Sequence, residues 1–315
     1  MATIDVVING NARRLAPHGA LHRRLVAAAE RCGARVHPTN TLDELEAVAH
    51  AIAARRTDGV VLAGGDGSHM AGVSALARAF DRRLPPVGLA PGGTVCTVAR
   101  NLGARGDAGA WGERLIAAAC AGTARIEPRT TLRVRDDARG DRVGFIFGAG
   151  LVARFFEVYD AAPRPGLPAA ARIAARVFAG SFVGSRLARR ILEPVPCTLW
   201  VDGESRSGRG WSLVLASVVR DVGLHLLATY RAGSDPQRFH VVASGLPPRA
   251  LGPQMPRVLT GRPLRGEPRV DSLACSLRVR FDGGAPGAYV LDGDLITAGE
   301  AHVETGPKLR LLSPP

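Results

Sequence analysis

Three glycines surround one aspartate at the end of a short apolar run in the N-terminal half of the chain. The run is Val60-Val61-Leu62-Ala63, and Gly64-Gly65-Asp66-Gly67-Ser68 follows it. Glycines between a strand and a helix let a ligand approach the main chain, and the N–H groups of such a turn attract phosphate. A carboxylate beside phosphate needs a metal or a transferable proton, so Asp66 indicates Mg²⁺–nucleotide chemistry. A tight turn with a surface aspartate is the alternative interpretation.

Two further polar turns follow apolar runs and are expected at the same edge of one sheet. Pro86–Ala90 has the composition of a buried strand, and Pro91-Gly92-Gly93-Thr94 follows it at once. The first apolar run, Ile4–Ile8, ends in Asn9-Gly10-Asn11-Ala12-Arg13. The carboxyl ends of parallel strands share one edge of a sheet, where open α/β folds bind their ligands. The sequence therefore predicts a phosphate site built from three turns.

Two carboxylates flank a glycine near the C-terminus, in Asp292-Gly293-Asp294. Asp-Gly is a common hairpin dipeptide, and the local sequence alone favours a simple turn. A carboxylate is also the group that accepts the proton of an alcohol while the alcohol is phosphorylated. Both interpretations remain open on the residues alone.

The order of expected elements divides the chain into two domains, in agreement with its length of 315 residues. Residues 1–126 alternate strands with helices, which predicts an α/β domain with a mainly parallel sheet. Thr41-Leu42-Asp43-Glu44 in this part has the form of a capping box that opens a helix. Residues 127–302 contain extended runs separated by Gly, Pro and Asp, which predicts a β-rich antiparallel sandwich.

A helical segment, residues 169–192, interrupts the strand-rich part. The stretch from Ala161 to Leu192 contains six arginines and no acid. A basic amphipathic helix of this kind can lie on an anionic membrane surface. An ordinary amphipathic helix with arginines toward solvent has the same pattern. The arginines are Arg164, Arg172, Arg176, Arg186, Arg189 and Arg190.

The charge of the chain comes almost entirely from arginine. The formal net charge is +13, and Lys308 is the only lysine. Walker-A loops and protein kinases each need a lysine at a set position, so both classes are excluded. The basic excess favours an anionic partner such as nucleotide or anionic lipid. Nucleic acid is not expected, because no recognition motif is present and only 5% of residues are aromatic.

Other kinds of site find little support. The five cysteines are scattered without a Cys-x-x-Cys pair, which favours buried thiols over a zinc site or a disulfide framework. Gly148-Ala149-Gly150-Leu151-Val152-Ala153 matches a dinucleotide fingerprint, but the acid expected about 20 residues later is missing. The N-terminus lacks the features of a signal peptide, and no apolar run reaches the ~18 residues of a membrane span. A cytoplasmic chain, soluble or peripheral on a membrane, is expected.

The order and spacing of these motifs resemble the diacylglycerol kinase catalytic family, which includes bacterial lipid kinases and sphingosine kinases and is distantly related to NAD kinases. The family has an Asn-Pro-x-Ser-Gly-like turn, then Gly-Gly-Asp-Gly-Thr, Pro-x-Gly-Thr, a Gly-x-Asp-Ala-like segment and Asp-Gly-Glu. The matching segments here are Asn9–Arg13, Gly64–Ser68, Pro91–Thr94, Gly150–Ala153 and Asp292–Asp294. The resemblance implies that residues 303–312 return to the first domain as its last strand.

Several positions depart from the family pattern. Met70 and Ala71 stand where the family has Asn and Glu, and Val152 replaces the Asp of the second-domain motif. Val95-Cys96-Thr97 replaces Gly-Asn-Asp after the second glycine turn. Asp294 replaces Glu, which moves the carboxylate by about one bond length (~1.5 Å).

The resemblance implies an ATP- and Mg²⁺-dependent lipid kinase, with diacylglycerol or a similar lipid as acceptor and a place in phospholipid biosynthesis. Asp294 would be the general base, Asp292 would orient it or assist the metal, and Asp66 would serve Mg²⁺–nucleotide chemistry. Arg13 or Arg14 would neutralise phosphate charge, and Thr39 would lie near the nucleotide. The other nucleotide contacts would be Asn9, Gly10, Asn11, Ala12, Gly64, Gly65, Gly67, Ser68, Gly92, Gly93 and Thr94.

Two alternatives remain open. The acceptor of a related kinase would be a sphingoid base or another alcohol. A catalytically weak nucleotide- or lipid-binding regulator is suggested by the departures at Met70, Val95, Cys96 and Thr97. The basic segment predicts peripheral contact with the inner face of a membrane. The sequence leaves the oligomeric state and any metal ligands open.

Overall fold

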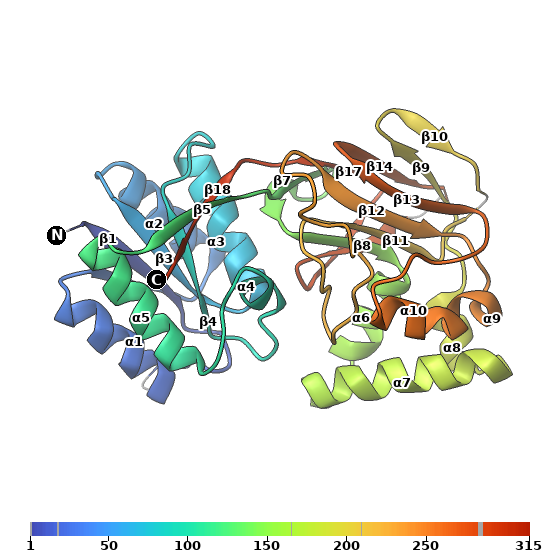
Figure 1. The fold of residues 1–315 in the computed structure, drawn as a ribbon, viewed down its shortest axis with the longest axis horizontal. Coiled ribbons are helices and arrows are strands. Elements are labelled where there is room, and N and C mark those ends of the chain that lie inside the picture. Colours follow the sequence, from blue (N-terminus) through green and yellow to red (C-terminus); the bar gives the residue numbers. More distant parts are fainter. Residues whose placement is uncertain (1, 18, 165, 209, 283–285) are drawn as a thin grey trace. The chain divides into compact units, whose positions relative to one another are not determined.

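The computed structural model describes residues 2–17, 19–164, 166–208, 210–282 and 286–315 (Figure 1). The chain forms two compact units. Unit 1 comprises Met1–Thr131 with Pro307–Pro315, and unit 2 comprises Leu132–Gly306. Each unit is described by itself below.

Unit 1 is a six-stranded sheet in the order β2-β1-β3-β4-β18-β5. All neighbouring strands are parallel except β18 and β5. Strands β3 and β4 are buried along their whole length, as expected for apolar strands covered on both faces. The strands are β1 (Ile4–Asn9), β2 (Arg35–Thr39), β3 (Gly59–Gly64), β4 (Val87–Pro91), β5 (Arg125–Arg129) and β18 (Leu309–Ser313).

Helices cover both faces of this sheet (Figure 1). Helix α1 packs with α5 on one face, and α2 packs with α3 on the other. The capping box predicted for α2 is confirmed, because Thr41 Oγ1 accepts a hydrogen bond from Glu44 N and the Glu44 carboxylate accepts one from Thr41 N. The helices are α1 (Ala20–Arg31), α2 (Leu42–Ala53), α3 (Asp66–Ala79), α4 (Thr97–Asn101) and α5 (Ala108–Ala121).

The C-terminal segment returns to unit 1, but not over the residues 303–312 that the family resemblance implied. Strand β17 (Glu300–Thr305) belongs to unit 2 and pairs with two strands there. Strand β18 begins only at Leu309 and lies between β4 and β5. The intervening residues 306–308 carry the chain from one unit to the other.

Unit 2 consists of two antiparallel six-stranded sheets, which confirms the predicted β-rich sandwich. Their orders are β10-β9-β14-β17-β6-β7 and β13-β12-β11-β8-β15-β16. Not every extended run of this part is a strand: residues 225–228 form none, because Leu224 and His225 adopt left-handed backbone conformations that a strand does not contain. The remaining strands are β6 (Leu132–Asp136), β7 (Gly140–Gly144), β8 (Ile146–Gly150), β9 (Cys197–Val201), β10 (Glu204–Arg206), β11 (Leu213–Ser217), β12 (Phe239–Ser244), β13 (Arg269–Ala274), β14 (Ser276–Phe281), β15 (Gly287–Leu291) and β16 (Asp294–Ala298).

The helical segment expected at residues 169–192 is two helices. Helix α7 (Leu167–Val183) ends at Gly184. Its φ of 67° is a left-handed conformation that often ends helices and that glycine adopts most easily. Helix α8 (Arg186–Leu192) starts again behind Ser185, whose side chain accepts a hydrogen bond from Ala188 N. None of the helices in the described residues is long and apolar enough to cross a membrane. The other helices of unit 2 are α6 (Leu151–Asp160), α9 (Pro248–Leu251), the 3-10 helix η1 (Gly252–Gln254) and α10 (Met255–Leu259).

Candidate active site

The three polar turns of unit 1 lie together at the carboxyl edge of its sheet, as their places after β1, β3 and β4 require. Asn9 Nδ2 donates to Ser68 Oγ over 2.6 Å, which joins the first turn to the second. Gly92 N donates to Gly64 O over 2.7 Å, and Arg14 N donates to Gly92 O over 3.2 Å. These bonds make the three turns one connected surface.

Close backbone contact explains the glycines at this edge. A Cβ on Gly93 would lie 2.6 Å from the Cα atom of Gly65, so the second and third turns approach too closely for a side chain. A Cβ on Gly92 would lie 2.2 Å from Leu15 Cδ1. The turns thus expose main chain rather than side chains to a ligand.

Helix α3 points its N-terminus at the same surface. It starts at Asp66, directly behind its N-cap residue Gly65, and no side-chain hydrogen bond caps this end of the helix. The first N–H groups of a helix have no intrahelical acceptor, and the helix dipole makes them favourable for an anion. Asp66, Gly67 and Ser68 supply the first turn, so the glycine motif and the helix N-terminus are one feature.

The Asp66 carboxylate is occupied by backbone amides. Its Oδ2 accepts from Thr97 N and its Oδ1 accepts from Val98 N, each over 2.8 Å. Burial raises the pKa of the Asp66 carboxyl, and the two amides act in the opposite direction. Asp66 therefore holds the start of α4, and with it the turn after β4, against the glycine motif. This positioning role was not predicted from the sequence.

The first turn is tied to the end of β2. Gly10 N donates to the carbonyl of Thr39 over 3.0 Å, and Asn11 Nδ2 donates to the carbonyl of Asn40 over 2.5 Å. Thr39 itself is buried. All the predicted nucleotide-binding residues of unit 1, from Asn9 to Thr94, thus lie at one edge of one sheet.

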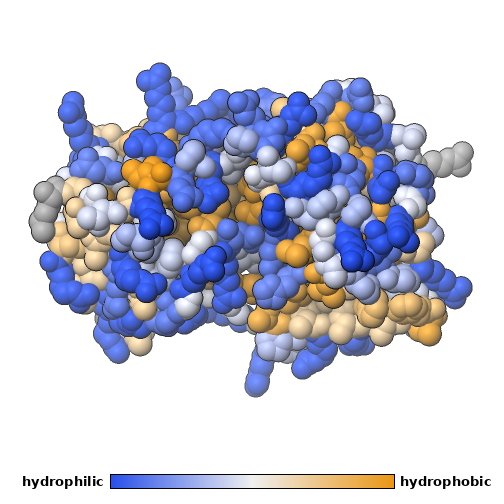
Figure 2. Space-filling model, in the orientation of Figure 1, coloured by the Kyte–Doolittle hydropathy of each residue, from blue (hydrophilic) through white to orange (hydrophobic). Residues whose placement is uncertain are grey.

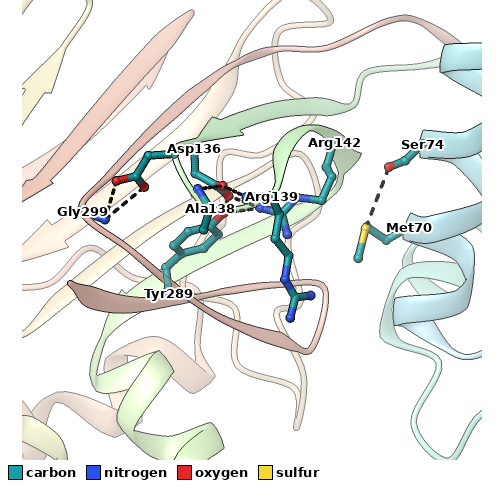
Figure 3. A network of polar contacts seen from close by, with 9 residues as sticks. Met70, Ser74, Asp136, Ala138, Arg139, Arg142, Tyr289 and Gly299 are labelled. Carbon is teal, nitrogen blue, oxygen red and sulfur yellow. Dashed lines mark hydrogen bonds and ion pairs between the residues drawn. The ribbon is translucent and has the colours of Figure 1, made fainter.

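The residues that depart from the family pattern have structural places in unit 1. Met70 is buried, and its sulfur accepts a hydrogen bond from Ser74 Oγ (Figure 3). Cys96 adopts a left-handed backbone conformation, and its sulfur accepts a hydrogen bond from Gly93 N over 3.1 Å. Burial raises the pKa of the Cys96 thiol, which leaves it a poor nucleophile. The buried Cys96 side chain thus supports the third turn through its contact with Gly93.

Asp292 forms the turn between β15 and β16 in unit 2. Asp292 and Gly293 both have positive φ, 48° and 99°, as a two-residue hairpin turn of this type requires. The buried carboxylate accepts from Phe145 N over 2.9 Å and from Ile146 N over 2.8 Å, where β7 ends and β8 begins. Both oxygens of Asp292 thus hold backbone in place, and the hairpin interpretation is confirmed at this residue.

Asp294 is the first residue of β16, and its side chain is partly exposed. Within the residues that the structure describes, no hydrogen bond or ion pair engages its carboxylate. Burial raises the pKa of Asp294, Asp160 adds to this effect, and Arg139 and Arg142 oppose it. An unengaged carboxylate with a raised pKa has the properties of a general base.

Sequence reasoning missed the charged groups around Asp294. Arg142 lies in β7 with its guanidinium buried, and its Nη2 donates both to Asp136 Oδ2 and to the hydroxyl of Tyr289 (Figure 3). The Tyr289 hydroxyl donates in turn to Asp136. Asp160 ends α6, which packs on β15 and β16. The strand pattern gave no signal for these residues, because their alternation is that of any half-buried strand.

Comparison with known proteins shows which family the residues of this site resemble. Residues 4–125 match the family model of the diacylglycerol kinase catalytic domain. These residues belong to the diacylglycerol kinase catalytic-domain family. The matched range contains all three turns and Asp66, so the connected surface of unit 1 is the surface of a kinase-family domain.

Solved structures with the same fold extend over the whole chain. A diacylglycerol kinase from Bacillus anthracis str. Sterne is 12% identical with a TM-score of 0.64, covering 100% of this chain and 97% of its own. A candidate diacylglycerol kinase from the same organism is 16% identical with a TM-score of 0.71, covering 100% of this chain and 96% of its own. At these identities the likeness establishes the fold of both units. The search of curated proteins gives no match to the chain.

Proposed function

We propose that the protein transfers the γ-phosphate of ATP to a hydroxyl group of diacylglycerol or a similar lipid. The observation that carries this proposal is the Asp294 carboxylate, unengaged and with a raised pKa, in a chain whose other unit is a diacylglycerol kinase catalytic domain. The phosphate-compatible surface of unit 1 and a carboxylate base supply the two parts that alcohol phosphorylation needs.

The ATP phosphates would lie on the three turns of unit 1. Main-chain N–H groups at Gly65–Ser68 and at Thr94 would be the donors, supported by the N-terminus of α3, while the N–H groups of Gly92 and Gly93 hold the third turn in place. The exposed Arg13 and Arg14 at the first turn are placed to neutralise phosphate charge. Lys308 serves a different purpose, because its Nζ donates to Thr130 Oγ1.

The residues of unit 1 fit a magnesium ion that arrives with ATP. Mg²⁺ is commonly held by one or two carboxylates together with substrate phosphates. Asp66 supplies one carboxylate beside the glycines, and each of its oxygens keeps lone-pair capacity beyond the amide that it accepts. Across the described ranges, no group of three or more His, Cys, Asp or Glu could hold a metal by itself. The ion would contribute neutralisation of phosphate charge.

Asp294 would act on the acceptor hydroxyl. The hydroxyl oxygen forms a bond to the γ-phosphorus, the bond from that phosphorus to the bridging oxygen of ADP breaks, and the hydroxyl proton moves to Asp294. The raised pKa makes Asp294 a stronger base than an exposed aspartate while leaving it ionised above that pKa. Asp292 would keep the turn in shape through Phe145 and Ile146.

The lipid would be reached at an anionic membrane surface through helices α7 and α8. The six arginines between Ala161 and Leu192 are all exposed. Phe182 and Val183 at the end of α7 are 57% and 75% exposed, and Figure 2 shows an apolar band over the position of α7. An exposed apolar end beside basic side chains is the combination that binds such membranes peripherally, here on the cytoplasmic side.

A catalytically weak regulator is the second candidate function. The observation in its favour is that Met70 and Cys96 are buried structural residues where the family has polar groups. The acceptor of an active enzyme could also be a sphingoid base or another alcohol.

One assay separates these functions. Radiolabelled ATP with Mg²⁺ is incubated with the protein and vesicles containing diacylglycerol, a sphingoid base or neither, and labelled lipids are identified by mass spectrometry. Label on diacylglycerol that disappears with Asp294→Asn supports the proposal. Label on the sphingoid base alone would identify that base, rather than diacylglycerol, as the acceptor. Nucleotide binding without any labelled lipid favours the regulator.

A further inference from the structure

Two cysteines of unit 1 face each other across a helix pair. Cys32 follows directly after α1, and Cys120 lies in the last turn of α5. Both are free thiols, and their sulfurs are 2.8 Å apart. A disulfide holds its sulfurs at about 2.0 Å, so less than ~1 Å of approach separates this pair from a covalent bond.

The elements that carry the two thiols are held together independently. Arg24 on α1 forms ion pairs with Asp107 over 3.0 Å and with Glu113 over 2.9 Å, both at α5. Apolar residues of the two helices share one core cluster with the underlying strands. The sulfurs therefore meet on a preformed scaffold, and bond formation requires little backbone movement.

The two thiols differ in their access to solvent. Cys32 is partly exposed, whereas Cys120 is only 2% exposed. Burial and the facing Cys32 raise the pKa of Cys120 to about 12. An external reagent would thus react first at Cys32, and Cys120 would act second, from within the protein.

We propose that Cys32 and Cys120 are an oxidation site, at which a small external disulfide converts the dithiol into an intramolecular disulfide. The Cys32 thiolate attacks one sulfur of the reagent, which forms a mixed disulfide and releases one thiolate. Cys120 gives its proton to that thiolate and attacks Cys32 Sγ, which releases the second thiol. Both protein thiols are oxidised, and the reagent is reduced to two thiols.

The bond would fasten the C-terminal end of α1 to that of α5, beside the start of β1, where Ala2 N donates to Cys120 O over 3.2 Å. It would close a loop across a sequence separation of 88 residues, and a loop of that length restricts the unfolded chain strongly. Sequence spacing did not reveal the pair, because only the packing of α1 on α5 brings the cysteines together. The proposal needs neither nucleotide nor lipid and is independent of the proposed function.

The test uses the full chain with Cys275→Ser, because Cys275 is the exposed cysteine that would react separately. The reduced protein, with four of its five cysteines left, is treated with oxidised glutathione, then unfolded and its free thiols counted. We expect two free thiols, a peptide map that links Cys32 to Cys120, and a melting temperature raised by roughly 5–15 °C.

Two further variants serve as controls. Cys120→Ser should retain glutathione as a mixed disulfide on Cys32, and Cys32→Ser should keep its buried thiols free; neither should gain thermal stability. Four free thiols after treatment of the Cys275→Ser protein would overturn the proposal. Glutathione that remains on Cys32 while Cys120 is intact would overturn it as well.

Discussion

At the scale of single residues, the two carboxylates of Asp292-Gly293-Asp294 have different tasks that their chemical identity does not reveal. Both carboxylate oxygens of Asp292 accept hydrogen bonds, from the amides of Phe145 and Ile146. The carboxylate of Asp294 has no hydrogen bond or ion pair within the described residues. The first is a structural residue of a hairpin, and the second is the candidate base. A charged group that is partly buried without a partner weakens the fold, so its presence is best explained by function.

Replacement of Asp294 by Asn should lower single-turnover phosphoryl transfer by about 10²–10⁴-fold at saturating ATP, because the proton acceptor is lost. ATP affinity should change little. Asp294→Glu restores the family's residue and should retain far more activity than Asn. The three proteins are compared by rapid quench with radiolabelled ATP. An Asn variant within about threefold of the wild type would leave Asp294 as an ordinary residue of the hairpin.

The raised pKa of Asp294 also predicts a pH dependence. The base must be ionised, so activity should fall as pH decreases through a pKa above the ordinary aspartate value of about 3.9. Ionisation of a group with a raised folded-state pKa opposes folding. The stabilisation from the protonated form is complete below the unfolded pKa and is lost as pH rises through the folded one. Asp294→Asn should therefore melt higher than the wild type at neutral pH, with no difference in strong acid, as measured by calorimetry across pH.

Asp66→Asn tests the link between the second and third turns. A neutral amide can accept only one of the two N–H groups at Thr97 and Val98, so the variant should lose about 1.5–3 kcal/mol of unfolding free energy. A carboxylate that served only Mg²⁺–nucleotide chemistry, the role that the sequence indicated for Asp66, would leave the stability unchanged. Phosphoryl transfer should also fall by orders of magnitude. The control is Asp81→Asn at an exposed residue of positive φ, which asparagine tolerates. Equal melting temperatures of the Asp66 and Asp81 variants would contradict the view that Asp66 holds the start of α4.

At the scale of elements, the sequence predicted what depends on local pattern and missed what depends on packing. Apolar runs and capping residues placed β1, β3, β4 and α2 because each carries its own signal. The start of α3 at Asp66 carries no such signal, because the glycine motif does not have the composition of a first helical turn. The bonds from Asp66 to the start of α4 and the bond from Tyr289 to Asp136 join residues far apart in sequence, and no local pattern reveals such pairs.

Charge reversal on α8 tests the membrane-facing role of the helical segment. Arg186, Arg189 and Arg190 are exposed, and each basic residue near an anionic surface contributes about 1 kcal/mol of binding. Changing all three to Glu should release the protein from phosphatidylserine-containing vesicles in a sedimentation assay. The matched control reverses three exposed arginines of unit 1, Arg56, Arg83 and Arg105. Equal loss of binding in both variants would mean that net charge, rather than this segment, attracts the membrane.

At the scale of the whole molecule, the chain leaves unit 1 after Thr131 and returns to it at Pro307. Strand β18 pairs with β4 in parallel and with β5 antiparallel, so the last residues of the sequence lie inside the sheet that carries the phosphate-compatible turns. Leu309, Leu311 and Leu312 are buried there. Unit 1 is therefore complete only after the whole of unit 2 has been synthesised.

Removal of residues 307–315 should consequently destroy unit 1 although it deletes no proposed catalytic residue. Each buried leucine lost from a core costs about 2–5 kcal/mol, and together three exceed much of the 5–15 kcal/mol that stabilises a typical domain. The amides of β1, β3 and β4 should then lose their protection from hydrogen exchange, while those of β8, β11 and β12 in unit 2 keep it. The control deletes only Pro314 and Pro315, which lie beyond β18. Exchange protection in unit 1 that survives the longer deletion would show that the first 131 residues fold without the returning strand.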